Sequence, residues 1–215
     1  MEQSQAKGLW KKKKFDYIKW KKRGDRYAAL VGVLLISPLF LVVALLIKLS
    51  DWHSPVIFKQ KRVGKDGVPF YMFKFRTMVC NAEQQLEKYL TANEIEGAMF
   101  KLKEDPRITK IGKFLRKTSI DELPQLINVI RGEMALVGPR PPLSREVKQY
   151  SNYDKQRLTV TPGCTGLWQV SGRNELSFAE MVELDLYYIE QMSFSFDVKI
   201  ISKTFAVMIL SKGAY

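Results

Sequence analysis

A run of twenty uncharged residues extends from Ala28 to Ile47 and is followed directly by Lys48. A helix of this length reaches across the roughly 30 Å hydrocarbon core of a bilayer. The run is too long for a cleaved signal peptide, and no small-residue cleavage site follows it. The sequence therefore predicts a membrane-inserted helix.

Ser37 and Pro38 lie at the middle of this run. Pro38 removes one helical hydrogen bond and crowds the carbonyl of Leu34, while the Ser37 hydroxyl can bond to a freed carbonyl. Basic residues flank the run on both sides, so the positive-inside rule places both flanks in the cytoplasm. A re-entrant helix that bends at Ser37 and Pro38 accounts for both observations. A single straight span is the alternative.

The charge of the chain points to an anionic partner. Lys and Arg number 35 against 22 Asp and Glu, which gives +13 with the single His neutral. Ten basic and three acidic residues lie within 1–27, so +7 is concentrated there. Nucleic acid, a phosphate-bearing substrate and an acidic membrane all fit such a charge. Aromatic residues are mixed with the lysines over residues 8–22, which favours membrane lipids.

The remaining composition predicts an ordinary globular unit. At 46% hydrophobic residues the chain can bury a core, which excludes general disorder. Cys80 and Cys164 lack a paired spacing, so we expect free thiols, and with one His a zinc site is not expected. We divide the chain into residues 1–48, a basic interfacial segment with the re-entrant helix, and residues 49–215, a compact cytoplasmic catalytic domain. The predicted class is mixed α/β, rich in helices, with short strands.

Several elements of this domain can be placed from local patterns. Strands are predicted over 56–58 and 69–75, with a hairpin turn at 65–67. A polar helix is predicted over 81–100, and another from Asp121 to a stop at Gly132, with Pro124 in its first turn. The loops 138–142 and 161–173 are rich in Gly and Pro, and rigid loops of this kind often carry function.

Two helices are predicted near the C-terminus. Ser177 and Glu180 form a capping box at the start of the first. Asp185 falls on its apolar face, where pairing with a buried Arg is the usual explanation and a role at a substrate site is the alternative. In the last helix, Val198, Ile201 and Phe205 share one side, which suits either the core or a membrane interface.

Asp121 and Glu122 are adjacent carboxylates at an expected helix start. Capping of that helix explains both residues. The functional alternative is that the helix dipole and Arg116 hold Asp121 ionised for attack on phosphorus, while Glu122 binds Mg²⁺. Six arginines in loop-like contexts could bind phosphates through their guanidinium groups: Arg62, Arg76, Arg107, Arg116, Arg140 and Arg173. No Walker loop, GxGxxG or kinase signature is present.

Over nearly all of residues 20–215 the chain resembles the bacterial sugar transferase family, the monotopic phosphoglycosyl transferases. The matching strings are the Ser-Pro break, QKRVG at 60–64, KFRTM at 74–78, DPRIT at 105–109, RKTSIDELPQLINVIRGEM at 116–134, VGPRP at 137–141 and PGCTGLWQVSGR at 162–173.

The resemblance implies transfer of a sugar 1-phosphate from a UDP-sugar to undecaprenyl phosphate, with release of UMP, as the first membrane step of exopolysaccharide or capsule synthesis. Asp121 matches the family's nucleophile, which forms a covalent phosphosugar intermediate, and Glu122 matches its metal-binding neighbour, with Mg²⁺ as the expected cofactor. Residues that match phosphate- or nucleotide-binding positions are Arg116, Pro139, Arg140, Pro141 and Arg173. Ser37 and Pro38 match the re-entrant break, which places the catalytic domain at the cytoplasmic face of the bacterial inner membrane.

The chain departs from the family pattern near its start. Lys21 and Lys22 precede Asp25 where the family has a Lys-Arg pair, and a Lys lacks the fork of the Arg. Arg26 replaces a usually apolar residue, and we expect it to reach the lipid headgroups. The chain lacks the additional membrane helices of long members, so it resembles the minimal catalytic form. Glucose and galactose are the sugars expected for short members, and no residue chooses between them.

Two other functional classes are alternatives to such an enzyme. One is a membrane-tethered binding or regulatory protein with an inactive phosphate site. The other is a membrane-anchored nucleic-acid binder, which we disfavour because no recognition module is present. We therefore expect membrane lipids as partners and no nucleic acid, and an oligomer is compatible with the sequence.

Overall fold

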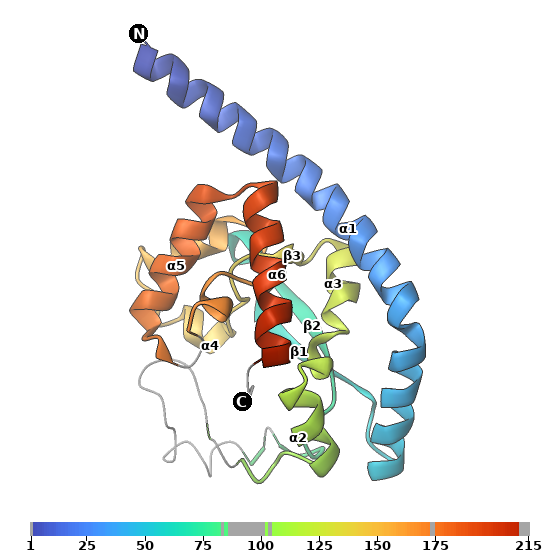
Figure 1. Ribbon diagram of the computed structural model, residues 1–215. Helices are drawn as coiled ribbons and strands as arrows, with labels where there is room; N and C mark the ends of the chain where they lie inside the picture. Colours follow the sequence, from blue (N-terminus) through green and yellow to red (C-terminus); the bar gives the residue numbers. More distant parts are fainter. Residues whose placement is uncertain (1, 83, 86–101, 103–104, 173–174, 211–215) are drawn as a thin grey trace.

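The computed structural model describes residues 2–82, 84–85, 102, 105–172 and 175–210. Most of the helix predicted over 81–100 lies outside these residues. The described part is a mixed, helix-rich fold with short strands, as predicted (Figure 1). Its helices and strands, in chain order, are α1 (Glu2–Ser50), β1 (Ile57–Val63), β2 (Pro69–Phe75), α2 (Lys110–Lys117), α3 (Gln125–Arg131), β3 (Ala135–Val137), α4 (Ser144–Val147), β4 (Gly163–Thr165), α5 (Phe178–Gln191) and α6 (Phe194–Leu210).

Strands β1 and β2 form the predicted antiparallel hairpin, in register from Ile57 opposite Phe75 to Val63 opposite Pro69. The turn lies at 65–67 as expected, where Asp66 and Gly67 both have positive φ (55° and 79°). The first strand is longer than the three residues predicted for it. Residues 59–62 are Lys, Gln, Lys and Arg, which are polar on both faces of the strand. The alternation of apolar and polar residues that marks a strand in sequence is therefore absent there.

Strands β3 and β4 form a second, parallel pair that was not predicted. Each has three residues, which is too short to show a periodicity in sequence. A Cβ added at Gly163 would lie 2.1 Å from the backbone N of Gly138. Only glycine at position 163 therefore permits these two backbone segments to approach so closely. This pairing brings together the two Gly/Pro-rich loops, 138–142 and 161–165.

Helix α3 begins at Gln125, four residues later than predicted. Pro124 has no N–H to donate to the carbonyl of Ile120, so the preceding residues close 3-10 hydrogen bonds instead. Asp121 and Glu122 lie in this 3-10 turn, after Ser119 in the left-handed conformation (φ 55°). Neither residue is therefore the N-cap of an α-helix. The predicted stop at Gly132 is confirmed, since it closes α3 with φ 78°.

Helix α1 is continuous through Ser37 and Pro38, and it curves along one side of the domain past α3 and α2 (Figure 1). The expected hydrogen bond from the Ser37 hydroxyl to the Leu34 carbonyl is present at 2.8 Å. The helix is long and apolar enough to cross a membrane over 16–50, and only 11% of its most apolar window is buried in protein. It therefore differs from the core helix of a soluble protein. A return of both ends to one membrane face stays a prediction.

One narrow face of α1 packs against the domain along much of its apolar run. Ala29 joins a core with Phe70, Met72, Val129 and Met134. One turn after Pro38 the contact continues, because Val43 and Ile47 pack with Phe75 and Leu115 in a second core. Helix α1 and the rest of the domain are thus joined through two hydrophobic cores.

The C-terminal helices α5 and α6 build a third core around Val137, Leu167, Tyr188 and Ile200. The capping box of Ser177 and Glu180 is confirmed. Asp185 pairs with the buried Arg157, which confirms the structural explanation for this carboxylate. In α6, Ile200 is fully buried and Ile201 of the predicted face packs against this core, whereas Val198 and Phe205 of that face are exposed.

Candidate active site

One cavity brings together three of the predicted site residues. It lies between the hairpin, the 3-10 turn before α3 and the two loops joined by β3 and β4. Its lining includes Arg62, Lys74, Glu122, Gln125, Arg140 and Pro141, with Met72, Gly163, Cys164 and Gln169 completing the wall. Glu122, Arg140 and Pro141 were predicted site residues, and the fold brings them together.

Lys74 is the most direct partner of the acidic pair. Its Nζ lies 2.6 Å from Oε1 of Glu122, and the two residues are 48 positions apart in sequence. Burial alone would raise the pKa of Glu122, but the charges of Lys74, Arg140 and Arg62 lower it to about 2. Glu122 is therefore an anion at neutral pH.

Asp121 lies beside this cavity and is 7% exposed. Burial and the charge of Glu122 raise its pKa to about 6, although Lys74 and Arg116 oppose the increase. The carboxylate is thus mostly ionised at neutral pH, as the functional interpretation requires. Lys74 opposes the increase more than Arg116 does, although only Arg116 was proposed from the sequence.

Arg116 is placed outside the cavity lining but close to Asp121. Its Nε donates to Oγ1 of Thr77 at 2.9 Å, so the segment that follows β2 and the end of α2 are tied together. Burial lowers the pKa of Arg116, whereas the charges of Asp121 and Asp105 raise it. Arg116 and Lys74 consequently present positive charge to Asp121 from two different elements.

Arg62 holds the loop that carries Arg140. Its side chain is 5% exposed, and Nη1 donates to the carbonyl of Pro141 at 2.9 Å. Burial and the neighbouring Arg140 lower the pKa of Arg62 to about 9, so it stays protonated at neutral pH. Pro139, also predicted, contributes its carbonyl to Gly163 N at 2.9 Å and so fixes the same loop.

Other predicted residues stand apart from this cavity. Arg173 lies outside the described residues. Arg107 pairs with Asp105 near Ala82, which makes it structural. Arg76 lines a second cavity at the end of α1. Cys164 is a free thiol in the wall of the first cavity, and burial raises its pKa, so it is neutral there.

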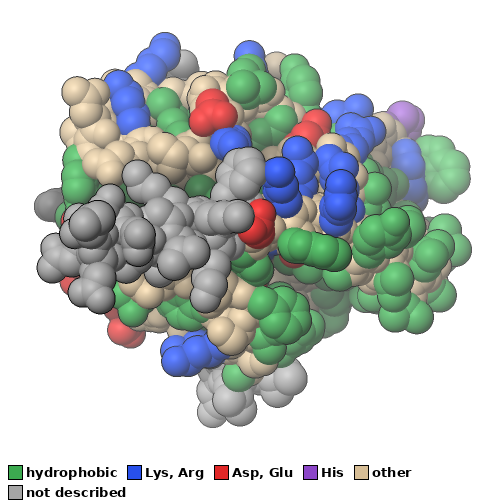
Figure 2. Space-filling model, turned by 90° about the horizontal axis from the view of Figure 1, so that it is seen from above, with side chains coloured by type: hydrophobic (Ala, Val, Ile, Leu, Met, Phe, Trp, Pro, Cys, Tyr) green, Lys and Arg blue, Asp and Glu red, His purple; other side chains and the backbone are tan. Residues whose placement is uncertain are grey.

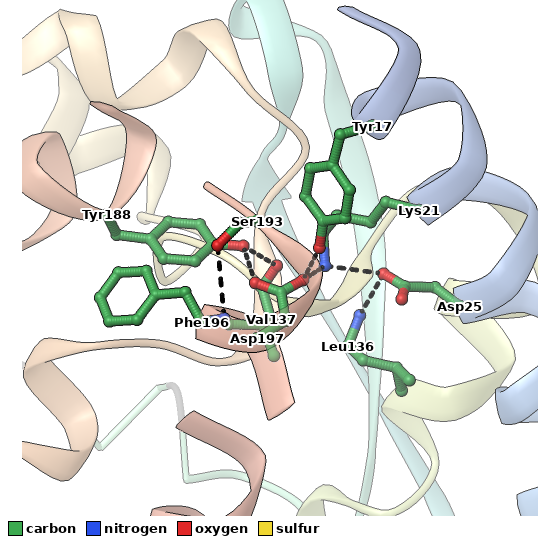
Figure 3. Close-up of polar contacts among 9 residues, drawn as sticks. All are labelled: Tyr17, Lys21, Asp25, Leu136, Val137, Tyr188, Ser193, Phe196 and Asp197. Atoms are coloured by element: carbon green, nitrogen blue, oxygen red, sulfur yellow. Dashed lines mark hydrogen bonds and ion pairs between the residues drawn. The ribbon is translucent and has the colours of Figure 1, made fainter. Parts of the chain in front are cut away.

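The segment that carries Lys21 and Asp25 is held by a polar network (Figure 3). Lys21 forms ion pairs with Asp25, at 3.1 Å, and with Asp197 of α6. Asp197 also accepts a hydrogen bond from Tyr17, and Asp25 accepts one from Leu136 N at 3.0 Å in β3. Lys21 therefore serves to fix α1 to the domain. Its neighbour Arg26 lies against Gly132 at the end of α3.

The donors present fit the expected Mg²⁺. Among the described residues there is no group of three or more His, Cys, Asp and Glu that could hold a metal on its own. Mg²⁺ commonly uses only one or two carboxylates and takes its other ligands from water and substrate phosphates. Asp121 and Glu122 supply that number, and the binding of the ion stays a prediction.

Comparison with known proteins places the chain among sugar transferases. A family model described as bacterial sugar transferase matches residues 16–211. The galactosyl transferase CpsE of Streptococcus agalactiae serotype III is 46% identical over 94% of this chain. ExoY, an exopolysaccharide production protein of Rhizobium meliloti, is 44% identical over 91% of this chain. The UDP-glucose:undecaprenyl-phosphate glucose-1-phosphate transferase of Escherichia coli K12 is 41% identical over 91% of it.

The relatives differ in length. This chain spans 44% of CpsE and 41% of the Escherichia coli transferase, but 88% of ExoY. The similarity thus covers less than half of the longer relatives and most of the shorter one.

Proposed function

The chain belongs to the bacterial sugar transferase family, and from this membership we propose that it moves a sugar 1-phosphate from a UDP-sugar to undecaprenyl phosphate and releases UMP. The name of the Escherichia coli relative specifies this kind of transfer with glucose, and CpsE is named for galactose. We expect glucose or galactose as the sugar, in the first membrane step of exopolysaccharide or capsule synthesis.

The proposed reaction proceeds in two displacements at one phosphorus. An oxygen of the Asp121 carboxylate bonds to the sugar-linked phosphorus, the bond to the bridging diphosphate oxygen breaks, and UMP leaves with the electron pair. An oxygen of the lipid phosphate then attacks the same phosphorus, and the bond to Asp121 breaks. The carboxylate is regenerated, so the two anionic substrates react in turn.

The cations around the cavity suit this chemistry. An ionised Asp121 repels a diphosphate, and the positive charges of Lys74, Arg62 and Arg140 in the cavity lining offset that repulsion. Mg²⁺, when held by Glu122 with Asp121, would supply Lewis-acid polarisation of the phosphate oxygens. Arginine forks at Arg62 and Arg140 are suited to orient the diphosphate.

The packing of α1 supports a membrane position at one leaflet. From Ala29 to Ile47 the helix rises roughly 27 Å, close to the thickness of the hydrocarbon core. The domain packs against both ends of this segment. A straight crossing would draw the charged hairpin and α2 into the lipid, at a cost of several kcal/mol for each unpaired charge, on the order of insertion scales. We therefore propose the re-entrant form, with the domain on the cytoplasmic side.

The observation that carries the proposal is the location of Asp121 and Glu122, adjacent in one turn, between cations contributed by β1, β2, α2 and the loop after β3. A capping role alone does not account for this convergence, since neither carboxylate caps an α-helix.

The direct test replaces Asp121 with Asn and measures UMP release from UDP-glucose and UDP-galactose with undecaprenyl phosphate in membranes. We expect loss of UMP release by a factor of at least about 10⁴, because an amide cannot act as the nucleophile. Asp66→Asn in the exposed hairpin turn is the matched control, and its turnover should equal that of the parent chain.

Trapping gives a second readout. After denaturation of the parent enzyme exposed to UDP-sugar alone, mass spectrometry should place a sugar phosphate on Asp121. An adduct on another residue would reject the assignment of the nucleophile. Absence of UMP release from every UDP-sugar tested would instead favour a membrane-tethered binding protein.

A further inference from the structure

A second cavity lies where α1 ends, and neither Asp121 nor Glu122 lines it. Its lining includes Ser50, Asp51, Ser54, Arg76, Met78 and Thr109. Leu49 and Trp52 beside it are each 71% exposed, so an apolar surface continues from α1 to the edge of this cavity. On the surface of the molecule, basic side chains gather next to broad apolar areas (Figure 2).

The guanidinium of Arg76 is held in place without an acidic partner. Its Nε donates to the carbonyl of Pro55 at 2.9 Å, and its centre lies 5.9 Å from the ring of Phe58. Nη1 lies 3.8 Å from the sulfur of Cys80. No acid among the described residues forms an ion pair with this side chain. An arginine fixed on one edge, with its charge unpaired, is prepared to bind a phosphate on the other edge.

Arg76 is also connected to the proposed active site. It follows Lys74 by two positions, directly after the end of β2. The Phe58 ring beside its guanidinium belongs to the residue opposite Lys74 in the hairpin register. Lys74 contacts Glu122, and Thr77, next to Arg76, accepts a hydrogen bond from Arg116. Positive charge therefore extends from the end of α1 to the acidic pair.

We propose that Arg76 binds the phosphate of the lipid acceptor in this second cavity and positions it for attack at the phosphorus on Asp121. This inference rests on the proposed function. The acceptor is a phosphate on a long apolar chain, and the exposed leucines of α1 give that chain an apolar path away from the cavity. Asp51 repels the anion, and its carboxylate already accepts the N–H groups of His53 and Ser54, so the phosphate is expected on the Arg76 side.

The two half reactions separate acceptor binding from the first displacement. Mixed with UDP-sugar alone, Arg76→Ala should still release one equivalent of UMP, like the parent enzyme. In turnover with undecaprenyl phosphate in detergent micelles, its KM for the lipid should rise roughly ten- to hundredfold, as expected for loss of a hydrogen-bonded charge. Arg76→Lys keeps the positive charge but lacks the guanidinium fork, so its KM for the lipid should lie between those of the parent enzyme and Arg76→Ala.

Arg131→Ala is the matched control, because Arg131 also stacks on a phenylalanine of the hairpin, Phe73 at 4.8 Å, but away from both cavities. Its lipid KM should not change. An unchanged lipid KM in Arg76→Ala would overturn the inference. The inference would also fail if Arg76→Ala weakened only the binding of the protein to vesicles of anionic phospholipid. If the parent enzyme releases no UMP, the proposed function itself fails, and the two failures are thereby distinguished.

Discussion

At the scale of single residues, the candidate site depends on how a few cations are divided between two neighbouring carboxylates. Lys74 bonds to Glu122 and is also the strongest positive influence on Asp121. Arg62 and Arg140 act on Glu122, and Arg116 acts on Asp121. Glu122 is therefore strongly acidic. Asp121 has a higher pKa because the effect of its burial exceeds that of the neighbouring positive charges.

Lys74→Met tests this division of charge. The side chain keeps its length and loses its charge, so we expect kcat/KM for UMP release to fall roughly a hundredfold, as for other single electrostatic groups at reacting phosphates and carbonyls. Lys61→Met, on the exposed side of β1, is the control and should retain full turnover. Equal rates in the two variants would show that Lys74 has only a structural role.

The residues of the site were predictable to different degrees. Asp121, Glu122 and Arg140 stand out in sequence because their neighbours form compact motifs. Lys74 and Arg62 contact residues that are 48 and 79 positions away in sequence. A local sequence pattern cannot predict contacts between residues so far apart. Arg76 was indicated only as one arginine among six. Its unpaired charge becomes visible when its surroundings are known.

At the scale of elements, the position of α2 depends on a close backbone contact. Gly112 faces Thr77, and a Cβ added at Gly112 would lie 2.0 Å from the Thr77 carbonyl oxygen. The backbone must move apart to admit any side chain. This contact also sets the distance over which Arg116 reaches Thr77.

Gly112→Ala should therefore destabilise the fold by about 1–3 kcal/mol, the usual cost of overpacking. Thermal unfolding in detergent should show a lower Tm, and UMP release should fall because Arg116 is displaced. Gly24→Ala in α1 is the control, since no atom lies within 4 Å of its added Cβ and alanine favours helix by about 1 kcal/mol. A Tm at or above that of the parent chain in Gly112→Ala would contradict this account.

Local sequence signals located the hairpin turn, the stop at Gly132 and the capping box of α5, because each depends on residues a few positions apart. The parallel pair β3–β4 escaped prediction, since its two strands are separated by 25 residues and held by a contact between glycines. The start of α3 was placed too early because Pro124 was treated as part of its first turn.

For the whole molecule, the proposed membrane position is tested by determining on which side of the membrane each end of α1 lies. In a chain without Cys80 and Cys164, single cysteines at Ser4 and Lys61 should react with a membrane-impermeant maleimide only after the cytoplasmic face is opened. Reaction at position 4 from outside the intact cell would mean a spanning helix. Labelling at position 61 shows in the same experiment on which side of the membrane the domain lies.

The same assay on Pro38→Leu examines the cause of re-entry. Restoring the missing helical hydrogen bond should favour crossing, so position 4 should become reactive from outside in part of the molecules. If labelling does not change, the packing of α1 on the domain, and not the proline, determines topology.

The two cores shared by α1 and the domain also bear on biogenesis. During translation α1 is synthesised before the hairpin, α2 and α3, so in the membrane position proposed above it would insert while they are still absent. Those later segments then condense on a surface already resting in lipid, which acts as a template for them. Folding and membrane insertion would then be coupled, and a copy left in the cytosol would expose the outer leucines of α1 to water and become a substrate for proteases.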